Sequence, residues 1–459
     1  MVAGVSSVFS FLSFAMSSAT QRFLSYELGR GNLKKYNEIF CMCMNIYALI
    51  ALVSGILLET IGIWFINTKL IIPYNRMEAV NIVYQFTVFS FVISTINSVY
   101  IANVTSHERM EIFAGMSIVD VVLRLIIVFV LSLVSVDKLK LYGILLFIVV
   151  CVHAVLYQII CTKAFNECKY KIFWNSNLFR EITGYIGWSI IGGIATVTRN
   201  QGINILLNMF FGPIVNAARG IAHQINSVII TFAQNIAEAT RPGIIKLYAE
   251  ENNAEMLSLA FYSTRIIYYL MLFLAVPLFL EAPFILKLWL NEVPEYTILF
   301  TRLLLIEAVI ECLRYSIDGI IFATGNIRRF QIMISGALIL VLPISYLFVK
   351  IGFPPQYPMI VGIFMSLAAF FLRLVIVRKV IKFPMKYFIE NILLKIIIAS
   401  ILIVILPLIM SMVMPLGIAQ FFIVGSTSVI SWILIVYFYG LEKEEKNKVN
   451  QIILKFLWR

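Results

Sequence analysis

Charged residues are scarce in this chain of 459 residues: they make up 13% of it, against about 25% in an ordinary soluble protein. Hydrophobic residues make up 61%, and the mean hydropathy is +0.94. A soluble core cannot absorb this much apolar surface, so most of these side chains must face lipid. The shortage of charge therefore argues against a soluble domain and predicts an all-α integral membrane protein.

Histidine and cysteine are also few, at three and six residues. No histidine has metal-ligand spacing with another histidine, a cysteine or a carboxylate, and no two cysteines form a C-x-x-C pair. The sequence contains no P-loop, no nucleophile elbow and no H-E-x-x-H motif. We therefore expect no metal, no cofactor, no disulfide framework and no enzymatic activity. A membrane enzyme is the alternative, but the predicted outer loops are too short to hold an active site outside the membrane.

The apolar residues are grouped in segments that are long enough to cross a bilayer, which takes about 20 residues. Breakers such as Gly212-Pro213 and Pro354-Pro355 separate some of these segments. We predict thirteen spans, near residues 2–23, 37–66, 78–105, 110–135, 141–163, 182–211, 213–240, 255–286, 296–323, 329–349, 356–377, 388–412 and 417–439.

The net charge of +12 indicates an orientation in the membrane rather than a nucleic-acid partner. Most loop lysines and arginines follow the odd-numbered predicted spans or lie in the C-terminal tail. Because basic residues accumulate in cytoplasmic loops, this bias places the C-terminus in the cytoplasm of a multi-pass protein. An odd number of spans then leaves Met1 on the other side.

The chain ends two apolar segments in a similar way, with "SSATQRFLSYE" at residues 17–27 and "EATRPGIIKLYAE" at residues 238–250. Glu59 and Glu281 match at nearly the same offset. Such a repeat predicts two parallel halves of six spans each. The second half opens with a span whose counterpart would precede Met1, so we expect one helix to be missing from an original fourteen.

The repeat and the loops together suggest a division of the chain. We predict an N-lobe at residues 1–163, a cytoplasmic linker at 164–181, a C-lobe at 182–378, two additional helices at 388–439 and a basic cytoplasmic tail at 440–459.

Polar residues that recur every three or four positions mark a candidate cavity. They form two stripes on either side of the Gly212-Pro213 turn, one beginning at Arg199 and the other containing Arg219. Amides and guanidinium groups suit a hydrated cavity that holds hydroxyl groups and phosphates. The alternative is that the amides only hold helices together in lipid. The predicted cavity residues in these stripes are Arg199, Gln201, Asn204, Asn216 and Arg219.

Two further groups of charges lie within predicted spans, where a charge costs about 2.5–3.5 kcal/mol on insertion scales. Asp120 and Arg124 have the i, i+4 spacing of a helical ion pair. A separate acidic stripe lies on one face of the ninth span. Its spacing allows Arg314 to pair with Glu311 and Asp318. Glu307 is left without a partner and could take up a proton. Ion coupling or pairing between the lobes is the expected role of Asp120 and of this acidic stripe, whose members are Glu307, Glu311, Arg314 and Asp318.

Several stretches of this sequence resemble the Wzx-type O-antigen and capsule flippases, polysaccharide biosynthesis proteins of the multidrug/oligosaccharidyl-lipid/polysaccharide (MOP) superfamily. They include "FLSFAMSSATQRFLSYELGRGN", "HERM" and "ATGNI", and the most specific is "NILLNMFFGPIVNAARG". The resemblance runs over nearly the whole chain. It implies a MATE-like fold with two lobes and two extra helices.

The resemblance also implies a function. Such proteins move undecaprenyl-pyrophosphate-linked oligosaccharides from the inner to the outer leaflet of the bacterial inner membrane by alternating access. The partners it implies are the lipid-linked oligosaccharide, membrane lipids and the polysaccharide polymerase machinery. The resemblance places the substrate cavity at the two polar stripes on either side of the Gly212-Pro213 turn, and it adds Arg124 from the first lobe. An ion-coupled exporter of drugs or other small molecules stays open as the alternative; its cavity would be acidic and aromatic.

Overall fold

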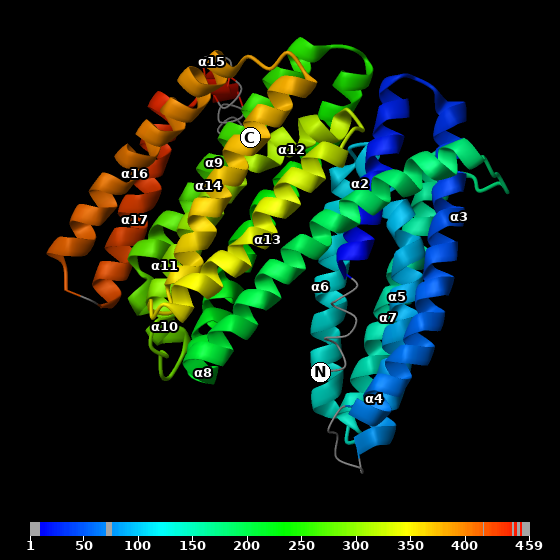
Figure 1. Ribbon diagram of the computed structural model, residues 1–459, viewed down its shortest axis with the longest axis horizontal. Helices are drawn as coiled ribbons and strands as arrows, with labels where there is room; N and C mark the ends of the chain where they lie inside the picture. Colours follow the sequence, from blue (N-terminus) through cyan, green and yellow to red (C-terminus); the bar gives the residue numbers. More distant parts are fainter. Residues whose placement is uncertain (1–9, 70–75, 416, 443–444, 448–449, 452–459) are drawn as a thin grey trace. The chain divides into compact units, whose positions relative to one another are not determined.

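A computed structural model describes residues 10–69, 76–415, 417–442, 445–447 and 450–451 (Figure 1). These residues form helices and turns, and no strand occurs among them, so the predicted all-α membrane class is confirmed. Ten helices in the described ranges are long and apolar enough to cross a membrane. Parts of the first predicted span and of the predicted tail lie outside the described residues.

The ten helices and the thirteen predicted spans agree once three differences are counted. The predicted spans at 182–211 and 213–240 are joined in helix α8, Ser176–Ala249. The predicted span at 296–323 is divided at Leu313 into two shorter helices, α11 and α12. The span predicted to begin at residue 2 corresponds to α2, Ser10–Gly29, which is less apolar than the other helices.

The chain packs as two compact units. Unit 1 contains residues 1–197, 242–256 and 322–331, and unit 2 contains residues 198–241, 257–321 and 332–459. In unit 1, α2 packs on α3 and α5, and α5 also packs along α7 (Figure 1). The other long elements of unit 1 are α3 (Leu33–Leu57) with its continuation α4 (Ile63–Lys69), α5 (Met77–Ser106), α6 (Met110–Leu133), α7 (Lys138–Ala164) and the two ends of α8.

Several helices of unit 1 begin at a residue whose side chain accepts hydrogen bonds from the free backbone amides of the first turn. The Asn32 side chain accepts from the Lys35 amide at 3.1 Å, and Asp137 accepts from the Leu139 amide at 3.0 Å. Asn175 does the same for α8. Caps of this kind contribute about 1 kcal/mol each and set where the chain turns into the membrane.

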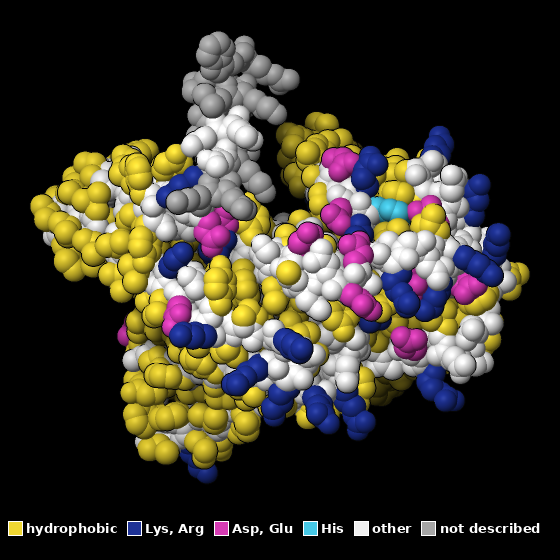
Figure 2. All heavy atoms as spheres, turned by 90° about the horizontal axis from the view of Figure 1, so that it is seen from above, with side chains coloured by type: hydrophobic (Ala, Val, Ile, Leu, Met, Phe, Trp, Pro, Cys, Tyr) yellow, Lys and Arg dark blue, Asp and Glu magenta, His cyan; other side chains and the backbone are white. Residues whose placement is uncertain are grey.

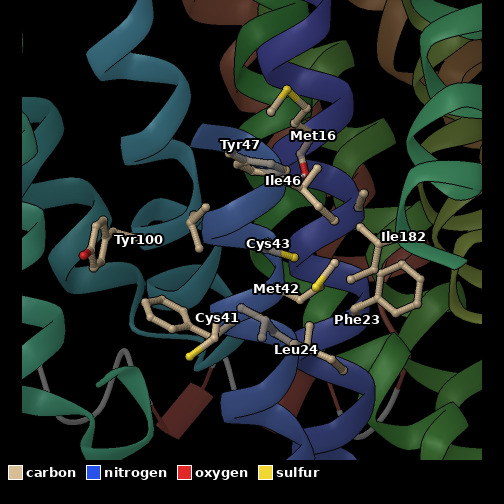
Figure 3. Close-up of a cluster of buried hydrophobic side chains, with 14 of the residues drawn as sticks. Met16, Phe23, Leu24, Cys41, Met42, Cys43, Ile46, Tyr47, Tyr100 and Ile182 are labelled. Atoms are coloured by element: carbon tan, nitrogen blue, oxygen red, sulfur yellow. Dashed lines mark hydrogen bonds between the residues drawn. The ribbon is translucent and has the colours of Figure 1, made fainter. Parts of the chain in front are cut away.

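The core of unit 1 combines large apolar side chains with a few satisfied polar groups. Figure 3 shows Met16, Cys43 and Tyr47 among side chains from α2 and α3, with Ile182 from α8 nearby. The Tyr47 hydroxyl lies against the Met16 carbonyl oxygen and the Thr20 hydroxyl. The hydrophobic effect does not drive helices together in lipid, so close packing and such buried hydrogen bonds hold the unit together.

The two similar sequence stretches end in turns of the same geometry. After α2, the Asn32 amide donates to the Glu27 carbonyl oxygen at 3.0 Å, and Gly31 has a φ of +68°. After α8, the Asn252 amide donates to the Leu247 carbonyl oxygen at 3.0 Å, and Glu251 has a φ of +60°. Gly31 and Glu251 thus occupy corresponding positions about 220 residues apart, as an internal repeat requires.

Unit 2 contains the middle of α8, residues 198–241, and most of the helices that follow it. Helix α11 packs on α14, and α16 and α17 pack side by side as a hairpin (Figure 1). Figure 2 shows the charged side chains of the whole molecule on the face seen from above Figure 1, where lysine and arginine are interspersed with aspartate and glutamate. The bounds are α9 Asn253–Leu280, α10 Ala282–Trp289, α11 Thr297–Cys312, α12 Arg314–Ala323, α13 Arg328–Lys350, α14 Tyr357–Val380, α15 Met385–Phe388, α16 Leu394–Val413 and α17 Ile418–Ile435.

Candidate substrate and ion-coupling site

The two polar stripes of α8 face each other because the helix is broken at Gly212. This residue has a φ of +84° and a ψ of −179°, a combination that is essentially restricted to glycine. Pro213 follows it and lacks the amide that an unbroken helix would use. On the far side of the break, the Arg219 guanidinium donates a hydrogen bond to the Asn204 side-chain oxygen. The structure therefore brings one residue of each predicted stripe into direct contact.

The Asn204 side chain links Arg219 to a second amide. Its nitrogen donates to the Gln201 side-chain oxygen at 3.2 Å. Arg219 is only 4% exposed, and its Nε atom has no hydrogen-bond partner among the described residues. The side-chain oxygen of Asn216 is likewise buried without a partner in this part of the chain. The stripe thus presents buried polar atoms whose bonding capacity is unfilled, which is the arrangement expected of a ligand site.

Arg199, the first residue of the stripes, has a different environment from Arg219. Its guanidinium donates to Glu307 through one nitrogen and to Glu311, at 3.2 Å, through another. The prediction that Glu307 has no partner was wrong, because the spacing along α11 could not reveal a partner from α8. Arg199 is therefore engaged by two carboxylates and is not a free cation for a phosphate.

Helix α14 completes this cluster with residues that the sequence reasoning missed. The Ser366 hydroxyl donates to Glu307 at 3.1 Å and lies 3.4 Å from Glu311. Gly362 lies one turn earlier, and a Cβ atom there would come within 3.1 Å of the Glu307 carboxylate. The sequence contained a partial indication of this contact. Gly362 and Ser366 are small residues at helical spacing, and a small-residue face lets a neighbouring helix approach closely.

The lower part of the acidic stripe is neutralised within unit 2 as well. Arg314 donates to Asp318 at 3.2 Å, so the pairing predicted from the i, i+4 spacing is confirmed. Arg373, on α14, donates to the other oxygen of Asp318 at 2.9 Å and was not predicted. Both Asp318 and Arg373 are almost fully buried. Such buried pairs are stable only when both partners are present.

The charges of this region can be counted. Three carboxylates, Glu307, Glu311 and Asp318, meet three guanidinium groups, Arg199, Arg314 and Arg373. We call these six residues the neutral cluster. Arg219 adds one positive charge beside it, because no carboxylate pairs with Arg219 in the described part of unit 2. The candidate site is thus cationic by one charge.

The predicted site residues of unit 1 have a more exposed setting. Arg124 donates to Asp120 at 2.8 Å, which confirms the i, i+4 pair. The Arg124 side chain is 57% exposed, and His153 lies 4.0 Å from Asp120. These residues lie on α6 and α7, within unit 1.

The chain is similar to several solved structures, whereas no family model and no curated protein matches it. An outward-facing multidrug resistance MATE transporter of the MOP superfamily matches with a TM-score of 0.71 at 13% identity, covering 82% of this chain and 86% of that chain. A MATE crystallised in complex with MaD3S matches with a TM-score of 0.72 at 13% identity, with coverages of 83% and 87%.

A third structure is a MOP superfamily transporter from Pyrococcus furiosus, described as having a binding pocket of reverse polarity that suggests a different function. It matches with a TM-score of 0.67 at 14% identity, covering 81% of this chain and 86% of that chain. At these identities the likeness establishes the fold. This chain has the helical fold of MATE transporters of the MOP superfamily.

Proposed function

We propose that this chain, which has a MATE-like transporter fold, is a flippase for lipid-linked oligosaccharides in the bacterial inner membrane, with its C-terminus in the cytoplasm. Its cargo would be a sugar repeat unit on undecaprenyl pyrophosphate, destined for O-antigen or capsule. The polysaccharide polymerase that receives the repeat unit would be its partner. Movement would follow alternating access of the cargo to the two leaflets.

The sign of the charge at the α8 stripes carries this proposal. Arg219 is buried, has an unfilled donor and meets no carboxylate in the described part of unit 2, so it can receive an anion. A guanidinium offers a fork of donors that matches phosphate oxygens. The neighbouring amides of Asn204, Gln201 and Asn216 suit hydroxyl groups of a sugar.

The same geometry weighs against a carrier of cationic drugs. Such a carrier needs a carboxylate that is free to face the cation. Glu307 and Glu311 are held by Arg199, and Asp318 is held by Arg314 and Arg373. If ion coupling occurs here, it requires a carboxylate of the neutral cluster to leave its arginine.

The experiment is to delete the gene in its host and to measure lipid-linked oligosaccharide on each leaflet of the inner membrane. The proposal predicts accumulation on the inner leaflet and loss of surface polysaccharide, both restored by the wild-type gene. Unchanged leaflet distribution together with increased sensitivity to cationic drugs would overturn it in favour of a drug exporter.

A further inference from the structure

Unit 1 contains a second buried arginine without a carboxylate partner. Arg22, on α2, is 7% exposed. The other buried arginines outside the α8 stripes pair with acids: Arg241 with Glu238 at 2.8 Å, and Arg265 with Glu442 at 2.7 Å. Since a buried charge is costly unless it is compensated, Arg22 calls for a counter-charge that the described part of the chain does not supply.

Arg22 lines a cavity of about 370 Å³ that lies entirely within unit 1. This volume falls in the range of small-ligand pockets. The walls come from α2, from the first turns of α8 and from the turn that precedes α13. The lining residues that matter here are Arg22, Glu181, Trp188, Gly325 and Arg328.

The contacts of Arg22 fix its guanidinium without neutralising it. Its Nη2 atom donates a long hydrogen bond, 3.4 Å, to the Ala323 carbonyl oxygen. The group also lies over the rings of Phe23, at 4.7 Å, and Tyr26, at 4.9 Å. Its Nε atom is buried and has no partner among the described residues. The side chain is therefore held in position with a donor unused.

The turn before α13 is shaped around this guanidinium. Gly325 has a φ of +76°, and a Cβ atom there would lie 2.4 Å from Arg22 Nη2. Arg328 adds a second cation, stacked over the Trp188 ring at 5.3 Å. Glu181 is the acid of the lining and is exposed. Two cations thus face the cavity against one solvated carboxylate.

We infer that this cavity is a phosphate-binding site that is distinct from the α8 stripes, with Arg22 as its buried donor and Arg328 as its exposed second cation. The inference rests on the proposed function for one candidate source of the phosphate, the pyrophosphate of the lipid-linked cargo. The other source is the headgroup of an anionic phospholipid. Both present the tetrahedral oxyanion that a guanidinium fork recognises.

The test uses the full chain in nanodiscs of phosphatidylcholine, with inorganic pyrophosphate as the probe at constant ionic strength. Trp188 lies under Arg328, so its fluorescence reports occupancy, and Trp188→Phe identifies that signal. We expect saturable binding that Arg22→Gln weakens by about tenfold, the value of one charge-assisted hydrogen bond. Arg328→Gln should weaken it in the same direction. Arg76→Gln, which removes an exposed arginine paired with Asp137, should leave it unchanged.

Equal affinity in wild type, Arg22→Gln and Arg328→Gln, or no saturable binding at all, would overturn the site. Arg328 is exposed, so its variant decides the matter even where Arg22→Gln fails to fold. Repeating the titration in nanodiscs with phosphatidylglycerol separates the sources: competition by this lipid assigns the site to a headgroup, and unchanged affinity assigns it to the cargo phosphate. Pyrophosphate binding by a chain that does not flip glycolipid would keep the site and reject the proposed function.

Discussion

Asn204 and Arg219 are hydrogen-bonded to each other although they belong to the same helical stretch and are separated by 15 positions. In a straight α-helix, residues so far apart lie about 22 Å from each other along the axis, at 1.5 Å per residue. The contact exists because the chain reverses at Gly212. The polar stripes of α8 become one site through this single backbone position.

Replacing Gly212 with alanine should destabilise the protein. Its φ of +84° with an extended ψ costs a residue with a Cβ about 1–3 kcal/mol. We expect a lower unfolding midpoint in detergent for Gly212→Ala. Gly220→Ala is the matched control, because Gly220 is helical and a Cβ there meets open space. Equal midpoints for the two variants would show that the break does not depend on glycine.

Removing Arg199 should be far more damaging than removing an exposed arginine. Arg199→Gln leaves Glu307 and Glu311 buried without their shared cation, which costs about 3–5 kcal/mol for a buried pair. The second change Glu307→Gln should restore part of that loss, because it removes one orphaned charge. Arg124→Gln, in an exposed ion pair, should cost about 1 kcal/mol or less. Denaturation of these three variants and of the wild type measures these differences.

The absence of rescue by Glu307→Gln would contradict the neutral cluster. It would mean that Arg199 stabilises the fold by packing and not by charge.

His107 should make stability depend on pH. Burial lowers the pKa of His107 from 6.5 to about 4. The positive charges of Lys246 and Arg109 also lower this pKa, whereas the nearby Glu167 raises it. The unfolded chain takes up this proton near pH 6.5, but the folded chain does so only near pH 4. Stability should therefore fall as pH drops through this window.

The measurement is the unfolding midpoint at several pH values between 7.5 and 4. We expect His107→Gln to reduce its slope. The same slope in wild type and His107→Gln would assign the pH dependence to other groups. The ring of His107 stacks on Phe165 at 4.1 Å, so His107→Phe serves as a second variant that keeps this contact.

The sequence predicted the local features of this protein better than its long-range pairs. Apolar segment length predicted the spans, and the Gly212-Pro213 pair predicted where α8 turns. Helical spacing predicted the Arg314–Asp318 contact, since residues four apart share a helix face. It could not predict that Arg199 reaches Glu307, because those residues are 108 positions apart and only packing of α8 against α11 joins them.

The environment of Arg22 is a second feature that could not be predicted from the sequence. Arg22 stands in the "SSATQRFLSYE" stretch that revealed the internal repeat, where it reads as one basic residue at the end of a span. The turn at Gly325, about 300 positions later, places a glycine directly against its guanidinium. No pattern within α2 carries that information.

The most direct test of the central claim is flipping of a polyprenyl-pyrophosphate-linked oligosaccharide by the purified chain in proteoliposomes. Wild type should move the glycolipid between leaflets. Arg219→Gln should slow this by about tenfold, Arg219→Lys should recover part of the rate, and Lys287→Gln, an exposed charge change in unit 2, should not alter it. Equal flipping by wild type and Arg219→Gln, with both proteins folded, would contradict the role of the α8 stripes, and no flipping by wild type would contradict the function itself.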